Sequence, residues 1–238
     1  MLKEKDSEYN MGTFYSPPLI HDGLVFCTDA NNIKSYIGSG TTLTDIASKK
    51  TGTISGATFS NGVLTYDGTN DKTSFTSTGL SSTTTNLTIS TWIKTNDKTL
   101  DSGAYRGWIT TGTGSNQTAC FKMSITHDNG YCVIWGLDNS AKVTADTALD
   151  GDVWYNVVYT YTSGTGKIYT NGVIDATASY TGNHDLTQFH LGSGGIGGNL
   201  DGVGMWNGEV GPVYVYNRVL TPTEVLQNFN ALRNRFGV

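Results

Sequence analysis

Apolar and polar side chains alternate in short segments along most of the chain. In residues 87–94 (LTISTWIK) every second position is apolar or β-branched, and this period of two predicts a half-buried strand. Residues 153–162 (VWYNVVYTYT) are aromatic or β-branched almost throughout, which predicts the strongest strand of the chain. Strand signals return about every 8–15 residues. Because they do not alternate with helical segments, the pattern predicts an all-β, antiparallel fold.

Two Asn-Gly dipeptides lie between strand signals and predict tight hairpin turns, because both residue types tolerate a positive φ. Asn171-Gly172 separates residues 167–170 from residues 173–175, and Asn129-Gly130 follows His127-Asp128. We expect each dipeptide to join two adjacent antiparallel strands.

One amphipathic helix is predicted near the C-terminus, over residues 221–233. Thr221 is a suitable N-cap, Pro222 occupies the first helical position and Glu224 completes a capping box. The apolar residues that follow fall on one face, and they are Val225, Leu226, Phe229 and Leu232. We expect this short helix to pack on the sheet and to cover an edge.

The first twenty residues differ in pattern from the rest. Residues 1–10 are rich in charge, and Pro17-Pro18 enforces an extended backbone. The sequence therefore divides into an N-terminal extended arm (1–20) and one sandwich domain (21–238). Aromatic residues such as Phe14 and Tyr15 suggest that the arm lies against protein. We expect the arm to be ordered and to contact another subunit. The alternative is that residues 14–20 lie along the arm's own domain as an extra edge strand.

Composition and charge exclude several functional classes. Charged residues make up 15% of the chain and the net charge is −5, and the longest basic run is Lys49-Lys50, so nucleic acid is not an expected partner. No stretch of about 18 apolar residues occurs, so no membrane span is expected. The N-terminal sequence MLKEKDSEYN lacks the apolar core of a signal peptide.

The three cysteines, Cys27, Cys120 and Cys132, cannot all pair within one chain. If Asn129-Gly130 forms a two-residue turn, Cys132 faces His127, and Cys120 lies too far from Cys132 for a disulfide. We therefore expect free, mostly buried thiols and a reducing compartment.

Three segments in order resemble one protein family. They are LTISTWIKT (87–95), VWYNVVYTYTSGTGKIYTNGVID (153–175) and NGEVGPVYVYNRVLTPTEV (207–225). They are similar to the laminin G-like, concanavalin A-like lectin/glucanase family. The resemblance implies a two-sheet antiparallel jelly-roll sandwich with a short C-terminal helix.

A narrower resemblance links residues 21–71 and the C-terminal sequence TPTEVLQNFNALRNRFGV to structural proteins of tailed bacteriophages. It implies a virion protein, assembled in the host cytoplasm as a head decoration, fibre or tail appendage. Its partners would be other virion subunits and host surface glycans. The alternative is a stand-alone carbohydrate-binding module or lectin.

The family includes glucanases, which need a pair of catalytic carboxyl groups about 5–5.5 Å apart for retaining hydrolysis. The glutamates of this chain are Glu4, Glu8, Glu209 and Glu224. The first two lie in the arm and Glu224 in the helix cap, so no predicted strand carries such a pair. We expect no enzyme activity and no required cofactor.

Related domains often hold a Ca²⁺ ion at the rim, and residues 67–71 concentrate oxygen ligands. Asp67, Asn70 and Asp71 are therefore candidate Ca²⁺ ligands. The same residues favour a simple Asx turn at the end of a strand.

Aromatic side chains stack on sugar rings in many lectins, and three tryptophans near glycine or loop residues are candidates for this role. They are Trp108, Trp135 and Trp206. Trp108, which follows a predicted loop at 101–107, is the strongest candidate of the three. Trp92 and Trp154 match strand positions of the family, so we expect them to pack in the core.

Overall fold

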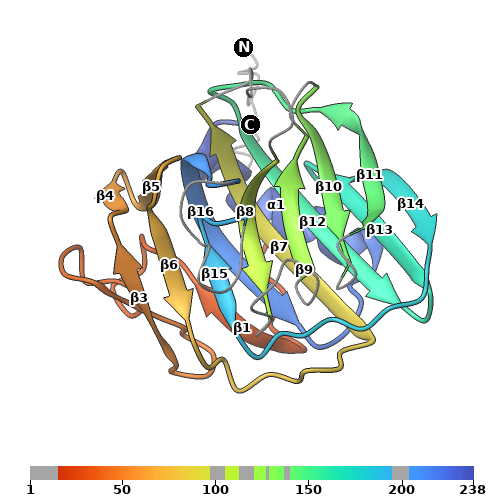
Figure 1. Ribbon diagram of the computed structural model, residues 1–238, viewed down its shortest axis with the longest axis horizontal. Coiled ribbons are helices and arrows are strands. Elements are labelled where there is room, and N and C mark those ends of the chain that lie inside the picture. The colour runs from red at the N-terminus through yellow and green to blue at the C-terminus, as the bar shows by residue number, and fades with distance from the viewer. Residues whose placement is uncertain (1–15, 97–104, 113–120, 127–128, 137–139, 195–203) are drawn as a thin grey trace, which may run out of the picture.

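The computed structural model describes residues 16–96, 105–112, 121–126, 129–136, 140–194 and 204–238. Its sixteen strands form two antiparallel sheets, which pack face to face as a sandwich (Figure 1). The predicted all-β sandwich with a C-terminal helix is therefore confirmed. No helix in these ranges is long and apolar enough to span a membrane.

Sheet A contains eight strands in the order β14-β13-β12-β7-β16-β5-β4, with β1 paired to β16. Their bounds are β1 Leu24–Thr28, β4 Thr58–Ser60, β5 Val63–Asp67, β7 Asn86–Thr95, β12 Trp154–Thr162, β13 Thr165–Thr170, β14 Val173–Ser179 and β16 Asn207–Tyr216. The long strands β7, β12 and β16 form the centre of this sheet.

Sheet B contains eight strands in the order β11-β10-β9-β8-β15-β6-β3-β2. Their bounds are β2 Thr42–Thr44, β3 Thr51–Ser55, β6 Lys72–Phe75, β8 Arg106–Thr111, β9 Phe121–Ile125, β10 Tyr131–Trp135, β11 Ala141–Ala148 and β15 Phe189–Leu191. Figure 1 looks onto this sheet, with sheet A behind it.

The strand β7 is buried on both faces, so the prediction of a half-buried strand is wrong. Its inner face carries Leu87, Ile89 and Ile93 into the core between the sheets. Its outer face is covered because Trp92 stacks against two phenylalanines of the C-terminal helix. The alternation predicted from the sequence is present, but the helix turns the outer face into a second apolar interface.

The helix α1 spans Pro222–Phe236 and lies on the outer face of sheet A. The predicted capping box is present, since the side chain of Thr221 accepts from the Glu224 N–H and the Glu224 carboxylate accepts from the Thr221 N–H. The predicted end at residue 233 is three residues short. Phe236 extends the helix because its ring packs over Trp92, where Gly211 provides room.

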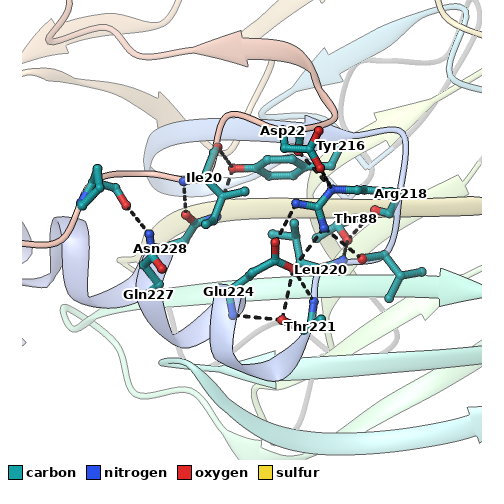
Figure 2. A network of polar contacts seen from close by, with 12 residues as sticks. Ile20, Asp22, Thr88, Tyr216, Arg218, Leu220, Thr221, Glu224, Gln227 and Asn228 are labelled. Carbon is teal, nitrogen blue, oxygen red and sulfur yellow. Dashed lines mark hydrogen bonds and ion pairs between the residues drawn. The ribbon is translucent and has the colours of Figure 1, made fainter.

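The described part of the arm, residues 16–20, packs on the sandwich domain itself. A closed ring of hydrogen bonds joins it to β16 and α1 (Figure 2). The Ile20 N–H donates to Asn228 Oδ1 at 2.8 Å, Asn228 Nδ2 donates to the Tyr216 hydroxyl at 3.0 Å, and that hydroxyl donates to Ile20 O at 3.0 Å. Residues 1–15, on which the predicted subunit contact depends, lie outside the described residues.

The two Asn-Gly dipeptides do join adjacent antiparallel strands. Asn171-Gly172 links β13 to β14 as a two-residue turn with positive φ at both positions, 51° and 81°. The hairpin at Asn129-Gly130 links β9 to β10, but Cys132 pairs with Ile125 rather than with residue 127. The predicted register is therefore off by two residues, which leaves each side chain on its expected face.

The thiols of Cys27 and Cys132 are free and buried, and Cys120 lies outside the described residues. Burial raises the pKa of the Cys27 thiol to about 12. This thiol is therefore protonated at neutral pH and a poor nucleophile.

Candidate functional site

A continuous row of polar side chains crosses the outer face of sheet B. Each residue is the direct cross-strand partner of the next, and the row runs Trp135, Lys122, Thr110, His190, Ser74 and Thr53. The intervening positions of the same strands point into the core. Five spacings between strands give the row a length of about 24 Å. A row of this kind offers hydrogen bonds along one line across the sheet.

One end of the row carries an exposed aromatic pair. The Trp135 and Tyr105 rings meet edge to face with centroids 4.4 Å apart, and Tyr105 is 44% exposed. The Trp135 indole N–H donates to Ser124 Oγ at 2.7 Å, which fixes the orientation of the ring. This arrangement is a rigid, partly exposed aromatic surface, hereafter the Trp135–Tyr105 platform.

The middle of the row is buried, because the chain after β15 folds back over the sheet. Thr110 donates to Ser193 O, and a Cβ added to Gly107 would lie 2.5 Å from Gly194 Cα. The Gly107 N–H donates to Gly204 O at 2.8 Å. Glycine is required here because two backbones approach within contact distance. Ligand access to the row is therefore from its ends.

His190 is the titratable group at the middle of the row. Its Nδ1 lies 3.0 Å from Ser74 Oγ. Burial, with a smaller contribution from the positive charge of Lys72, lowers the pKa of its imidazole to about 4. The ring is therefore neutral at pH 7 and adds no charge to the row.

Two of the three tryptophans predicted to stack on sugars are fully buried, so this prediction is wrong for Trp108 and Trp206. Their rings meet edge to face in the core, with centroids 5.4 Å apart. The sequence is misleading for Trp108 because β8 contains a bulge between Gly107 and Ile109. The bulge turns Trp108 inward beside Ile109. Only Trp135 among the three is available at the surface.

The three predicted Ca²⁺ ligands form a hydrogen-bonded turn at the end of β5. Asp67 Oδ1 accepts from the N–H groups of Thr69 and Asn70, at 2.8 and 3.4 Å. Asp71 Oδ2 accepts from the Asp67 N–H at 3.0 Å, and burial raises the pKa of the Asp71 carboxyl. No cluster of three or more acidic, histidine or cysteine side chains suited to a metal occurs in the described part of the chain. The Asx turn accounts for these contacts.

We expect a chelator to leave the thermal unfolding of the protein unchanged, because backbone amides already occupy the Asp67 and Asp71 carboxylates. The measurement is the melting temperature with and without EDTA. A ligand bound only to the native state stabilises it by mass action, so a lower melting temperature in EDTA would overturn the Asx-turn interpretation.

A family model described as the concanavalin A-like lectin/glucanases superfamily, of the laminin G type, matches residues 67–226. The chain belongs to this superfamily. The three sequence segments that resembled the family correspond to β7, the β12–β14 meander and the β16–α1 unit at the centre and outer face of sheet A.

Solved structures share the fold of this lectin/glucanase domain at low sequence identity. A Trypanosoma rangeli sialidase in complex with sialic acid aligns with 93% of this chain at 15% identity and a TM-score of 0.65, over 36% of its own chain. Domain 4 of the arabinanase AbnA from Geobacillus stearothermophilus, in complex with arabinotriose, aligns with 86% of this chain and 97% of its own, at 16% identity and a TM-score of 0.63.

The binding domain of botulinum neurotoxin DC, in complex with SialylT, aligns with 90% of this chain and 52% of its own, at 15% identity and a TM-score of 0.66. The lectin/glucanase domain thus spans about a third of the sialidase chains that it matches. No curated protein sequence matches it. At these identities the likeness shows the fold alone.

The glutamates of the described residues are engaged in separate ion pairs. Glu209 Oε1 lies 2.9 Å from Lys94 Nζ on the outer face of sheet A. Glu224 Oε1 lies 2.7 Å from Arg218 Nη2 in the helix cap. The pair of adjacent carboxyl groups that a retaining glucanase requires is not formed by these two residues.

Sequence reasoning missed Tyr105 and Ser124 as members of the site. The position of Ser124 can be predicted from the sequence, because every second residue of Phe121–Ile125 is polar. These residues, Lys122 and Ser124, therefore face outward. The role of Tyr105 cannot be predicted in this way, because only the pairing of β8, β9 and β10 brings Tyr105 to Trp135.

Proposed function

We propose that this domain is a non-enzymatic carbohydrate-binding module, and that the Trp135–Tyr105 platform contacts the sugar. The observation that carries the proposal is the combination of an oriented, partly exposed indole with the polar row that begins beside it. The aromatic faces match the apolar C–H face of a sugar ring. Lys122 and Thr110, the residues of the row nearest to the platform, are buried, so the aromatic faces are the part of the site that is open to a sugar.

The comparisons support this proposal over a virion role. The arabinanase domain is recorded with arabinotriose, and the toxin domain is recorded in complex with SialylT. Both share the sandwich fold of this chain. A carbohydrate ligand is therefore a use that the same architecture already has in other proteins.

A role as a bacteriophage structural protein, with virion subunits as partners and the virion as location, is a second proposal. It rests on the resemblance of residues 21–71 and of the C-terminal sequence to tailed-phage proteins. The solved structures and the family model add no support to it. Carbohydrate binding by the domain would be compatible with that role, as contact with host glycans.

Replacing Trp135 by alanine is expected to weaken glycan binding about ten- to hundredfold, because a buried aromatic contact contributes about 1.5–3 kcal/mol. The glycan is first identified on an array of neutral and charged oligosaccharides. Affinity is then measured by calorimetry for the wild type, Trp135→Ala and Tyr105→Ala.

Tyr131→Ala is the matched control, because it removes an aromatic side chain from the same strand, β10, outside the platform. It is expected to bind as the wild type does. Equal affinity of Trp135→Ala and Tyr131→Ala would contradict the proposed site. Release of new reducing ends from the bound glycan would contradict the non-enzymatic assignment.

A further inference from the structure

A cavity of about 240 Å³ opens on the outer face of sheet A, beside the C-terminal end of α1. Its floor is a second cross-strand row on four adjacent strands. The row runs Trp154, Lys94, Glu209 and Thr65. Sheet B lies on the far side of the core, so no residue of the Trp135–Tyr105 platform contributes to this cavity.

The apolar wall of the cavity comes from Trp154, Phe236 and Val63. The rings of Trp154 and Phe236 are tilted by 51° with centroids 4.6 Å apart, and Phe236 is in turn stacked on Trp92. The packing of Phe236 on the sheet therefore fixes the partly exposed Trp154 ring. This wall offers an apolar ring surface to a ligand.

The polar wall contains one group whose hydrogen bonding is incomplete. Glu209 Oε1 accepts from Lys94 Nζ at 2.9 Å, and both side chains are mostly buried, at 17% and 23% exposed. Glu209 Oε2 is buried without a hydrogen-bond partner among the described residues. A buried acceptor without a partner costs free energy comparable to a lost hydrogen bond. A donor from a ligand would satisfy it.

The remaining charge on the cavity wall is already paired. Arg235 binds both carboxylate oxygens of Asp29, at 2.8 and 3.0 Å, and donates to Gly62 O at 2.9 Å. Its guanidinium is therefore not a free anion site.

These charges restrict the chemistry of the ligand. The charges on the cavity wall cancel in pairs, Lys94 with Glu209 and Arg235 with Asp29, so the cavity has no net charge to favour a cation or an anion. A neutral molecule with hydroxyl groups would donate to Glu209 Oε2 and accept from Lys94 Nζ. A ring with one apolar face would also cover Trp154.

We propose that this cavity is a second carbohydrate site, which takes one neutral sugar ring against Trp154 with a hydroxyl group on Glu209. Its volume lies below the roughly 300–1,000 Å³ of pockets for drug-sized ligands, which fits a single ring rather than an oligosaccharide. Thr65, Ser60 and Asn61 line the opening and provide further hydroxyl and amide contacts. The cavity would bind the same class of ligand as the Trp135–Tyr105 platform, and in this it rests on the proposed function, but the two sites share no residue.

The test is a titration of the full chain with glucose, galactose and mannose, followed by two-dimensional NMR of the indole N–H groups. The Trp154 resonance is assigned by its loss in Trp154→Phe. At least one of the neutral hexoses is expected to shift this resonance, with a dissociation constant in the millimolar range. Glu209→Gln is expected to weaken binding about five- to tenfold, because a hydrogen bond to a carboxylate is roughly twice as strong as one to a neutral acceptor.

Glu224→Gln is the matched control, since it removes a glutamate charge that is paired with Arg218 outside the cavity. It is expected to leave the hexose-induced shift of the Trp154 resonance unchanged. Glu209→Gln preserves the shape of the side chain, so it remains informative if Trp154→Phe fails to fold. An unshifted Trp154 resonance at high hexose concentration would overturn the inference.

Other outcomes distinguish this site from the platform on sheet B. Hexose binding that is lost in Trp135→Ala and kept in Glu209→Gln would overturn the second site and leave the proposed function intact. Binding lost in Glu209→Gln and kept in Trp135→Ala would support it. Stronger shifts with tetramethylammonium or sulfate than with any hexose would show that the ligand class is wrong.

Discussion

Replacing Trp92 by alanine is expected to lower the free energy of unfolding by about 3–5 kcal/mol, the usual cost of deleting a fully buried tryptophan. Trp92 lies on β7 at the centre of sheet A, and its ring stacks on Phe229 and Phe236 with centroids 5.7 and 4.3 Å away. Its loss would leave a cavity beneath α1. The helix therefore depends on this one side chain for much of its contact with the sheet.

The measurement is urea denaturation of the wild type and Trp92→Ala, followed by far-UV circular dichroism. Leu226→Ala serves as the control, because Leu226 is an apolar residue of the same helix that is 43% exposed. We expect that variant to lose about 1 kcal/mol or less. Equal losses in the two variants would show that the helix is not held through Trp92.

Acid is expected to destabilise the domain between about pH 6.5 and pH 4, through His184 and His190. Burial lowers the pKa of each imidazole to about 4 from an ordinary value of 6.5. His184 Nε2 lies 2.9 Å from the Tyr159 hydroxyl and its Nδ1 lies 3.3 Å from Thr84 O. The neutral ring can donate to the carbonyl and accept from the hydroxyl, whereas the protonated ring cannot accept.

The direction of this effect follows from proton uptake. Between pH 6.5 and pH 4 the unfolded chain binds protons at both histidines while the folded chain does not, so the free energy of unfolding falls as the pH falls. A difference of about 2.5 in pKa corresponds to about 3 kcal/mol for each histidine, and the loss levels off below pH 4. For a domain of ordinary stability, about 5–15 kcal/mol, this is a large fraction.

The measurement is the urea midpoint from about pH 7 to about pH 4. The His184→Gln and His190→Gln variants are compared by the slope of stability against pH, since their stability at pH 7 changes for other reasons. In each variant, the slope of the free energy of unfolding against pH is expected to be about half of the wild-type slope. A wild-type stability that is flat over this range would contradict the burial of neutral histidines. Glu224 does not take up a proton in the folded state between pH 6.5 and pH 4, because its hydrogen bond to Arg218 lowers its pKa to about 2.

Local signals in the sequence predicted the local structure well. The Asn171-Gly172 turn and the Thr221–Glu224 capping box each depend on residues within a few positions of one another, and both form as predicted. The Asn129-Gly130 hairpin shows the limit of such signals. Its strands pair as expected, but the register depends on contacts that the turn residues do not specify.

Features that depend on distant pairing could not be predicted in the same way. The alternation in residues 87–94 indicates a strand but not that α1 covers its outer face. The bulge that turns Trp108 inward leaves no mark in the pattern of apolar residues. The candidate site on sheet B unites residues of six strands, from β3 to β15 in chain order, and only the order of the strands in the sheet brings them together.

The position of β16 has a consequence for synthesis of the protein. This strand is the last to be made, yet it lies within sheet A, where it pairs with β7, β5 and β1. The Ile20 N–H can donate to Asn228 Oδ1 only after Asn228, 208 residues later in the chain, has been synthesised. At about 5–20 residues per second, the ribosome needs roughly ten to forty seconds to provide that partner. The early strands therefore have exposed edges during translation, and the domain completes its fold only after β16 and α1 have left the ribosome.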